Sequence, residues 1–151
     1  MQQIDTDLYS RQIGTFGLET MGKLIQMNVV IIGMRGLGVE IAKNLILAGP
    51  KSVFIYDPEI TKINDLGANF YLTEAHVGKT TRANGSVTKL QELNPYVKVD
   101  VIPDEQALHS AIASGSTHVV CQTEMIFNGS VLNQAALDEE CRAHKAGYIS
   151  S

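Results

Sequence analysis

The sequence predicts an α/β fold of the Rossmann-like type, a mostly parallel sheet with helices on both faces and a helical arm before it. Three observations lead to this prediction. A short apolar run at 29–33 enters three closely spaced glycines, Gly33, Gly36 and Gly38. Apolar residues then recur at helical spacing. Strand-like and helix-like segments alternate along the rest of the chain, which is typical of a parallel sheet covered on both sides.

The glycine turn is the strongest single signal in the chain. Glycine accepts the backbone angles of a sharp turn, and its missing side chain lets a phosphate approach the amides at a helix N-terminus. The spacing here is G-x-x-G-x-G, whereas dinucleotide-binding dehydrogenases prefer G-x-G-x-x-G, and Arg35 occupies the place of their second glycine. The turn therefore supports a Rossmann-like unit better than it supports any ligand.

An arm at 8–17 and a helix at 18–26 are expected before the first strand. A Rossmann unit does not need such a preamble, so we expect it to pack on the sheet or on a second copy of the fold. Arg11 lies among residues that can form hydrogen bonds, a composition that fits a contact surface or a solvated arginine. We assign 1–27 to the arm and helix and 28–151 to the Rossmann-like domain.

The second strand is expected at 52–57, after Gly49 and Pro50 end the first helix. Asp57 closes this strand, about 20 residues past the glycine turn, where nucleotide-binding units place an acceptor for ribose hydroxyls. An aspartate before Pro58 is also a common way to begin a turn. The sequence leaves both interpretations of Asp57 open.

The remaining segments continue the alternation of helices and strands. A long connection at 59–79 carries a helical hint at 73–76, and connections of this length are usually functional. On the last helix we expect one apolar strip to cover the sheet and a second strip, Leu137 and Cys141, to lie on another side. The first strip is Val131, Leu132, Ala135, Ala136 and Ala143. We also expect the chain to be a fragment of a longer protein, because it stops within or just after a strand. The expected segments are a helix at 80–93, a strand at 97–102, a helix from Asp104 to about 114, a strand at 117–121, a helix at 130–145 capped by Ser130, and a strand at 148–150.

Composition limits the classes of function. The 151 residues are 44% hydrophobic and 19% charged, which fits one globular domain. A formal charge of −4 disfavours nucleic acid as a partner. The chain has neither a long apolar run nor the basic and apolar regions of a signal peptide, so we expect no membrane partner and a cytoplasmic and nuclear location.

The two cysteines and four histidines form no recognisable catalytic or metal-binding motif. Cys121 closes an apolar strand and Cys141 lies 20 positions further on, without a neighbouring histidine or cysteine at ligand spacing. A buried thiol is the favoured interpretation of Cys121. The sequence predicts no metal site and no disulfide.

Five ordered segments resemble the N-terminal adenylation-like half of the ubiquitin-activating enzymes. They are 8–12 (LYSRQ), 33–44 (GMRGLGVEIAKN), 69–72 (NFYL), 77–79 (VGK) and 92–97 (ELNPYV). The resemblance covers nearly the whole chain from residue 5 and implies an α/β fold of the ThiF/MoeB type. It also implies a reaction in which ATP and the C-terminal glycine of ubiquitin give an acyl adenylate and pyrophosphate, before a cysteine in another domain takes the acyl group.

The family has two such halves, and only the second normally keeps the full ATP site. Active halves carry Asn-Leu-Asn-Arg-Gln-Phe after the ribose aspartate, where this chain has DLGANF at 65–70. Ala68 replaces the arginine, Gly67 replaces an asparagine, and Asp65 adds a negative charge where a phosphate would approach. Asp57 and Lys79 match two retained positions, so with the three glycines they form a nucleotide-binding remnant.

The resemblance therefore implies the inactive half, with ATP and Mg²⁺ bound by the other half and no cofactor or catalytic residue here. Its implied partners are the active half of the same enzyme, ubiquitin and ubiquitin-conjugating enzymes. Arg11 matches an arginine that reaches across to ATP in the active half of related enzymes. Two alternatives remain: the small subunit of a SUMO-activating enzyme, and an NAD(P)-binding oxidoreductase domain. The glycine spacing does not support the oxidoreductase alternative, and that alternative does not explain the N-terminal arm.

Overall fold

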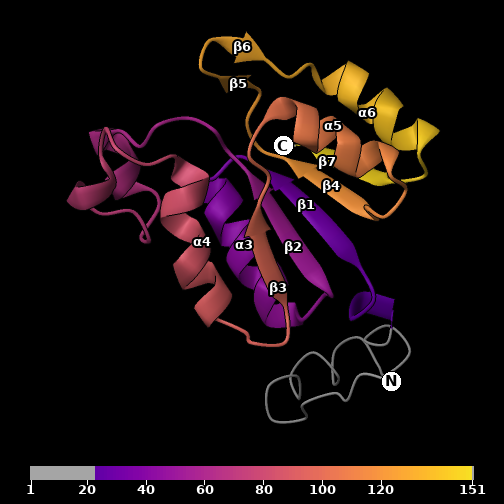
Figure 1. Cartoon of the computed structure of the whole chain (residues 1–151), viewed down its shortest axis with the longest axis horizontal. Helices are drawn as coiled ribbons and strands as arrows, with labels where there is room; N and C mark the ends of the chain where they lie inside the picture. Colours follow the sequence, from indigo (N-terminus) through magenta and orange to yellow (C-terminus); the bar gives the residue numbers. More distant parts are fainter. Residues whose placement is uncertain (1–22, 151) are drawn as a thin grey trace.

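The computed structural model describes residues 23–150 of the chain, and within them lies a five-stranded parallel sheet. The strand order is β3-β2-β1-β4-β7, with β1 in the centre (Figure 1). In the register, Ile31 of β1 lies between Ile55 of β2 and Cys121 of β4. The sheet confirms the predicted α/β class. Its strands are β1 (Asn28–Ile32), β2 (Ser52–Tyr56), β3 (Lys98–Val101), β4 (Val119–Gln122) and β7 (Gly147–Ser150).

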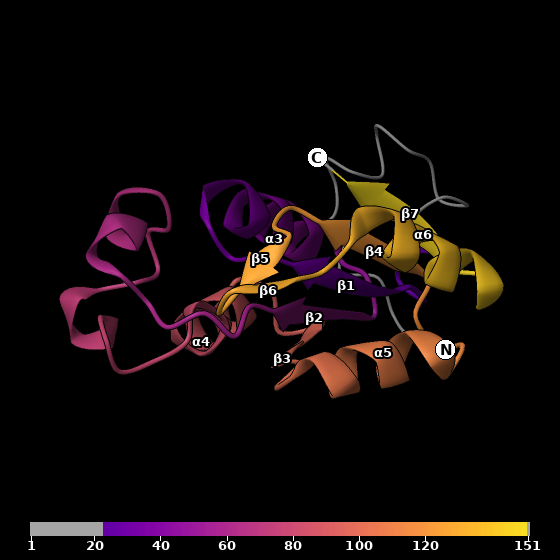
Figure 2. The same cartoon turned by 90° about the horizontal axis from the view of Figure 1, so that it is seen from above.

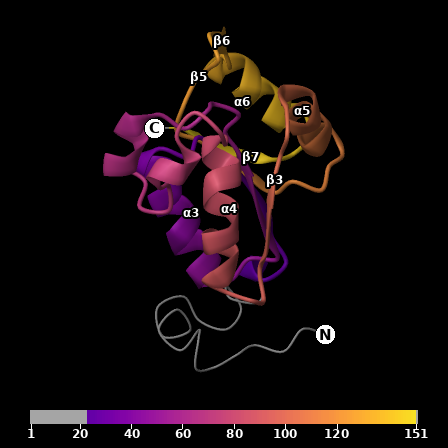
Figure 3. The ribbon, with the colours of Figure 1, turned by 60° about the vertical axis from the view of Figure 1, so that its left-hand side comes forward.

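Two helices cover each face of the sheet. Helices α3 (Gly36–Ala48) and α4 (Arg82–Glu92) run side by side on one face, where they enclose the core around Val29 and Ile31 (Figure 3). Helices α5 (Glu105–Ala113) and α6 (Gln134–Ala143) enclose a second core around Val30 and Ile32. Figure 2 shows α3 and α5 on opposite sides of β1 and β2. The residues of β1 from Val29 to Ile32 are all apolar because both faces of the strand are buried there.

Short polar side chains begin α4 and α5 at positions that local sequence rules favour. Thr81 accepts a hydrogen bond from the amide of Asn84 and begins α4. Asp104 accepts one from the amide of Ala107 and begins α5, as predicted. Gly49 ends α3 at φ +93°, a left-handed conformation that favours glycine.

The connection from β2 to α4 projects to one side of the sheet (Figures 1 and 3). It contains two 3₁₀ turns, η1 (Ile63–Gly67) and η2 (Glu74–His76), and η2 confirms the helical hint at 73–76. A β-bridge between Ile60 and Thr81 closes the base of this loop. The expected arm at 8–17 and most of the expected helix at 18–26 lie outside the described residues.

The expectation that Ser130 caps the last helix is wrong. Ser130 belongs to a small hairpin formed by β5 (Ile126–Phe127) and β6 (Ser130–Val131). Asn128 and Gly129 form its turn with φ of +52° and +80°, the positive angles that a two-residue Asn-Gly hairpin requires. Asn133 accepts from the amide of Ala136 and caps α6 in place of Ser130.

The expected buried face of the last helix is wrong for its alanines, although Leu132, just before α6, is buried as expected. Leu137 and Cys141 are buried in the core shared with α5, whereas Ala135, Ala136 and Ala143 are exposed. Both strips are apolar, so periodicity alone did not separate them. The structure buries the strip with the larger side chains, which remove more apolar area from water per residue.

We expect Leu137→Ala to lower the free energy of unfolding by about 2 to 5 kcal/mol, because it opens a cavity beside α5. Ala136→Ser, one position earlier on the exposed side, is the control and should change it by less than about 0.5 kcal/mol. Urea unfolding followed by circular dichroism measures both values. Equal losses from the two variants would contradict the buried face described here.

Candidate functional site

The glycine turn at the carboxyl end of β1 is packed against its own backbone. Gly33 has φ +103°, and a Cβ on it would lie 2.4 Å from Oγ1 of Thr123. A Cβ on Gly38 would lie 1.8 Å from the carbonyl oxygen of Gly33, so helix α3 meets the strand without room for a side chain. A Cβ on Gly36 would lie 3.3 Å from Cβ of Ala68 in the projecting loop. The three glycines therefore serve close packing at this turn.

Asp57, at the end of β2, is tied to the glycine turn. Its side chain is buried, and Oδ2 accepts a hydrogen bond from the amide of Met34 at 2.7 Å. The same oxygen lies 2.8 Å from Nε of Arg82, and Oδ1 accepts from the amide of Glu59 at 3.1 Å. Both carboxylate oxygens of Asp57 are thus engaged by groups of the chain itself.

Arg82 joins Asp57 to a second buried carboxylate. Arg82 is 5% exposed, and its Nη1 lies 3.3 Å from Oδ1 of Asp65. Oδ2 of Asp65 accepts from the amide of Lys62 at 2.9 Å. We call Asp57, Arg82 and Asp65 the buried ion triad. It links the end of β2, the start of α4 and the first 3₁₀ turn of the projecting loop.

The sequence interpretation did not identify Arg82 as a site residue, and its expectation for the direction of the Asp65 carboxylate was wrong. Asp65 was expected to face an approaching phosphate, but its carboxylate is 3% exposed and turned inward to Arg82. A basic residue in the first turn of a helix opposes the helix dipole. That unfavourable position was the one local hint that Arg82 has a carboxylate partner.

Burial and charge act in opposite directions within the triad. Burial raises the pKa of Asp57 above its ordinary value, and Arg82 and the Met34 amide offset part of the increase. For Arg82, burial lowers the pKa, but the charges and hydrogen bonds of Asp57 and Asp65 outweigh it and the net pKa is raised. The arginine therefore stays charged, and it compensates the cost of burying the two carboxylates.

A buried amide extends the network to the turn. Nδ2 of Asn69 donates to the carbonyl of Met34 and to Oγ of Ser86, both at 2.9 Å. Its Oδ1 accepts from the amide of Tyr71 at 2.9 Å. Met34 is thereby held through its amide by Asp57 and through its carbonyl by Asn69. The hydrogen bonds of Asn69 therefore connect the projecting loop to the glycine turn.

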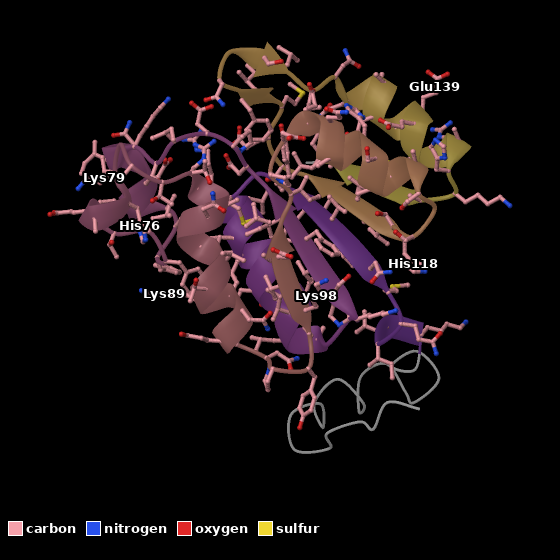
Figure 4. All side chains as sticks on the ribbon, in the orientation of Figure 1. His76, Lys79, Lys89, Lys98, His118 and Glu139 are labelled. Atoms are coloured by element: carbon pink, nitrogen blue, oxygen red, sulfur yellow. The ribbon has the colours of Figure 1, made fainter. Side chains whose placement is uncertain are left out.

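The structure brings together four of the six site residues expected from the sequence. Gly33, Gly36, Gly38 and Asp57 meet at the carboxyl edge of the sheet. Lys79 lies on the outer part of the projecting loop, exposed, and forms no ion pair with a residue of the described range (Figure 4). Arg11 lies outside the described residues.

A hollow of about 310 Å³ opens beside Asp57. Its charged lining residues are Asp57 and Asp100, and the lining set contains neither lysine nor arginine. At the N-terminus of α3, Arg35 lies 3.7 Å from the carboxylate of Glu124. Because Arg82 compensates Asp57, the charge left in this lining is the carboxylate of Asp100, which disfavours a phosphate group.

Both cysteines are buried, and two of the histidines contact neighbouring polar groups. Burial raises the pKa of the Cys121 thiol, and burial with Glu140 and Asp138 nearby raises the pKa of Cys141 to about 11. His109 lies 2.7 Å from Glu140, and Nδ1 of His118 accepts from the amide of Asn28 at 3.0 Å. Residues 23–150 contain no cluster of three or more potential metal ligands, and none of their helices meets the length and apolarity needed for a membrane span.

These features define a Rossmann-like domain with a glycine turn and an acidic strand end, and a comparison of the sequence with protein families identifies its class. The model of the ThiF family matches residues 9–146, so the chain belongs to the ThiF family. The predicted resemblance to the ubiquitin-activating enzymes is confirmed at the level of relatives, which are 38–55% identical and carry that name or a ubiquitin-like modifier-activating one.

Three relatives show the extent of the match. The chain is 44% identical to ubiquitin-activating enzyme E1 1 of Arabidopsis thaliana over 145 residues, which is 95% of this chain and 13% of that protein. It is 38% identical to ubiquitin-like modifier-activating enzyme 1 of Dictyostelium discoideum over 148 residues, or 98% of this chain and 14% of the relative. It is 54% identical to ubiquitin-activating enzyme E1 1 of Schizosaccharomyces pombe over 101 residues, or 67% of this chain and 10% of the relative. The chain thus spans a small part of these relatives.

Solved structures share the fold at low sequence identity. The E. coli tRNA N6-threonylcarbamoyladenosine dehydratase TcdA, in complex with AMP, has a TM-score of 0.82 at 17% identity, over 99% of this chain and 61% of that one. The same enzyme in complex with ATP has a TM-score of 0.77 at 16% identity, over 96% of this chain and 58% of that one. These comparisons confirm the ThiF-type fold predicted from the sequence.

Proposed function

We propose that this chain is the N-terminal, catalytically inactive adenylation half of a ubiquitin-activating enzyme, and that it scaffolds the active half. The names of its relatives support the enzyme class. The buried ion triad carries the proposal of inactivity. A charged arginine inside the chain neutralises the aspartate at the position where related folds place the acceptor for ribose hydroxyls.

The arrangement around Asp57 supports the proposed loss of ATP binding. A ribose hydroxyl could bind Asp57 Oδ2 only by displacing the Met34 amide or Arg82. The displaced group would then be buried without its hydrogen-bond partner. The lining of the hollow beside Asp57 offers a nucleotide no cation, and Asp100 adds a negative charge to it. Ala68, which matches the arginine of active halves, meets Gly36 with a methyl group that cannot donate a hydrogen bond to phosphate.

In this proposal the active half of the longer enzyme binds ATP and Mg²⁺ and adenylates the C-terminal glycine of ubiquitin. A cysteine in another domain then takes the acyl group as a thioester for ubiquitin-conjugating enzymes. This chain supplies a rigid partner surface for that half and lies with the enzyme in the cytoplasm and nucleus. The glycines, Asp57 and Lys79 are on this view a remnant of a nucleotide site.

A thermal-shift titration of the chain with Mg-ATP, AMP and NAD tests the inactivity. A ligand at about 100 times its dissociation constant stabilises a protein by about 2.7 kcal/mol, which is easily measured. We expect no shift with any of the three. Stabilisation by ATP would contradict the proposed loss of the site, and stabilisation by NAD would favour the oxidoreductase alternative.

We expect Arg11→Ala in the full-length enzyme to slow adenylate formation by at least about tenfold, because an arginine supplied across an interface stabilises charge on a transferring phosphoryl group. ATP–pyrophosphate exchange measures this rate. Arg142→Ala, an exposed arginine on α6, is the matched control and should leave the rate unchanged. An unchanged rate in Arg11→Ala would contradict the proposed contact of Arg11 with ATP in the active half. A melting temperature of Arg11→Ala equal to that of the parent enzyme would show that a slower rate does not come from unfolding.

A further inference from the structure

A second hollow begins at the amino ends of β1, β2 and β3. It shares Val101, Ile102 and Pro103 with the hollow beside Asp57. Its volume is about 540 Å³, within the range of about 300 to 1,000 Å³ typical of small-molecule sites. Phe54, Ile102 and Ala111 form its apolar part, between β2, the end of β3 and helix α5. It forms because α5 and α6 cover the central strands but not this corner of the face.

The charged residues that line this hollow are two lysines, Lys51 and Lys98. The ammonium group of Lys98 lies 5.7 Å from the ring centroid of Phe54, and the amide of Lys98 donates to the carbonyl of Lys51 at 3.2 Å. Neither lysine forms an ion pair with a carboxylate of residues 23–150. Figure 4 shows Lys98 on β3, away from the projecting loop that carries Lys79.

The nearby carboxylate does not neutralise this pair. Asp100 is two residues along β3 from Lys98, but it lines the hollow beside Asp57 instead, and its Oδ1 accepts from the amide of Val101 at 2.8 Å. In a chain of net charge −4, the hollow therefore joins an apolar floor to two cations without ion-pair partners in this part of the chain. Polar groups at its edge are already bound: Asn28 accepts from Ser52 and donates to the carbonyl of Ser116.

We infer that this hollow binds a small amphipathic carboxylate, with the apolar tail on Phe54 and Ile102 and the carboxylate between Lys51 and Lys98. An apolar tail is favoured because binding removes its surface from water. A carboxylate is favoured over a neutral or cationic head because it meets two ammonium groups without an opposing charge in the lining. This site is separate from the glycine turn and does not depend on the proposed function.

The probe is 4-phenylbutyrate, titrated into the ¹⁵N-labelled chain and followed by amide chemical shifts. We expect saturable shifts at residues lining the hollow, with a dissociation constant in the low millimolar range for a ligand of this size. 4-Phenylbutylamine, with the same tail and the opposite charge, should bind at least about fivefold more weakly, as should butyrate, which lacks the ring.

Variants of the two lysines test the head group. The double variant Lys51→Gln, Lys98→Gln should weaken 4-phenylbutyrate binding about fivefold, because each exposed ion pair contributes a small amount. Lys89→Gln on α4, away from the hollow, is the control and should leave binding unchanged (Figure 4). Ala111→Leu should weaken binding by filling the apolar part.

Equal binding of the amine and the carboxylate, or an unchanged constant in the double variant, would overturn the inference. So would shifts that fail to saturate or that centre on other residues. Melting temperatures of the variants within a few degrees of the parent show that any loss of binding comes from the site itself.

Discussion

Replacing Arg82 with methionine is expected to lower the free energy of unfolding by about 3 to 5 kcal/mol. Methionine keeps much of the length of the side chain, but Asp57 and Asp65 lose their shared cation while they stay buried. Leaving a buried charge without compensation costs more than the ion pair itself contributes. Urea unfolding at pH 7 measures the loss, and a change below about 1 kcal/mol would contradict it.

Arg142→Met is the matched control. Arg142 forms an ion pair with Asp138 one turn away on α6, at 3.0 Å, but its side chain is 78% exposed. An exposed pair at this spacing contributes about 0.3 to 0.5 kcal/mol, so this variant should be nearly as stable as the parent. The difference between the two arginines isolates the effect of burial.

The loss in Arg82→Met should also depend on pH. Without the guanidinium, the pKa of Asp57 should rise further, since burial already raises it and Arg82 opposes that increase. A raised carboxyl pKa means that the folded state binds more protons than the unfolded state, so stability falls as pH rises. The deficit of the variant should therefore shrink as pH is lowered from 7 toward 5. A triple variant that adds Asp57→Asn and Asp65→Asn should recover part of the loss at pH 7.

Gly38→Ala is the second variant with a large expected effect, a loss of about 3 kcal/mol or more. Its Cβ would lie 1.8 Å from the carbonyl oxygen of Gly33, so the start of α3 must move away from β1. Backbone atoms cannot yield as a flexible side chain can. The displacement would also disturb the bond between the Met34 amide and Asp57, which joins the turn to the triad.

Gly67→Ala provides the comparison for Gly38→Ala. A Cβ on Gly67 meets nothing within 4 Å, and this residue does not have a positive φ. The change should be neutral or stabilising by up to about 1 kcal/mol, since alanine restricts the unfolded chain. Equal melting temperatures for the two alanine variants would show that the contact of Gly38 with Gly33 does not limit stability.

Local signals in the sequence were enough for the fold class and most elements. The apolar run and glycine turn predicted β1 and α3, and Asp104 predicted the start of α5. The Asn-Gly pair at 128–129 was an equally local signal for the β5–β6 hairpin, but Ser130 was interpreted as a cap instead. These features depend on residues within a few positions of one another, where backbone preferences act directly.

The sequence by itself determined the α/β alternation, the glycine turn and the position of Asp57 at the end of β2. The tertiary structure alone decided which strip of α6 is buried and what surrounds Asp57. Asp57 and Arg82 are 25 residues apart, and Asp65 and Arg82 are 17 apart. Such contacts exist because α4 packs on the sheet and brings the projecting loop with it. Periodicity reports which face of an element is apolar, but it carries no information on which distant charge that face will meet.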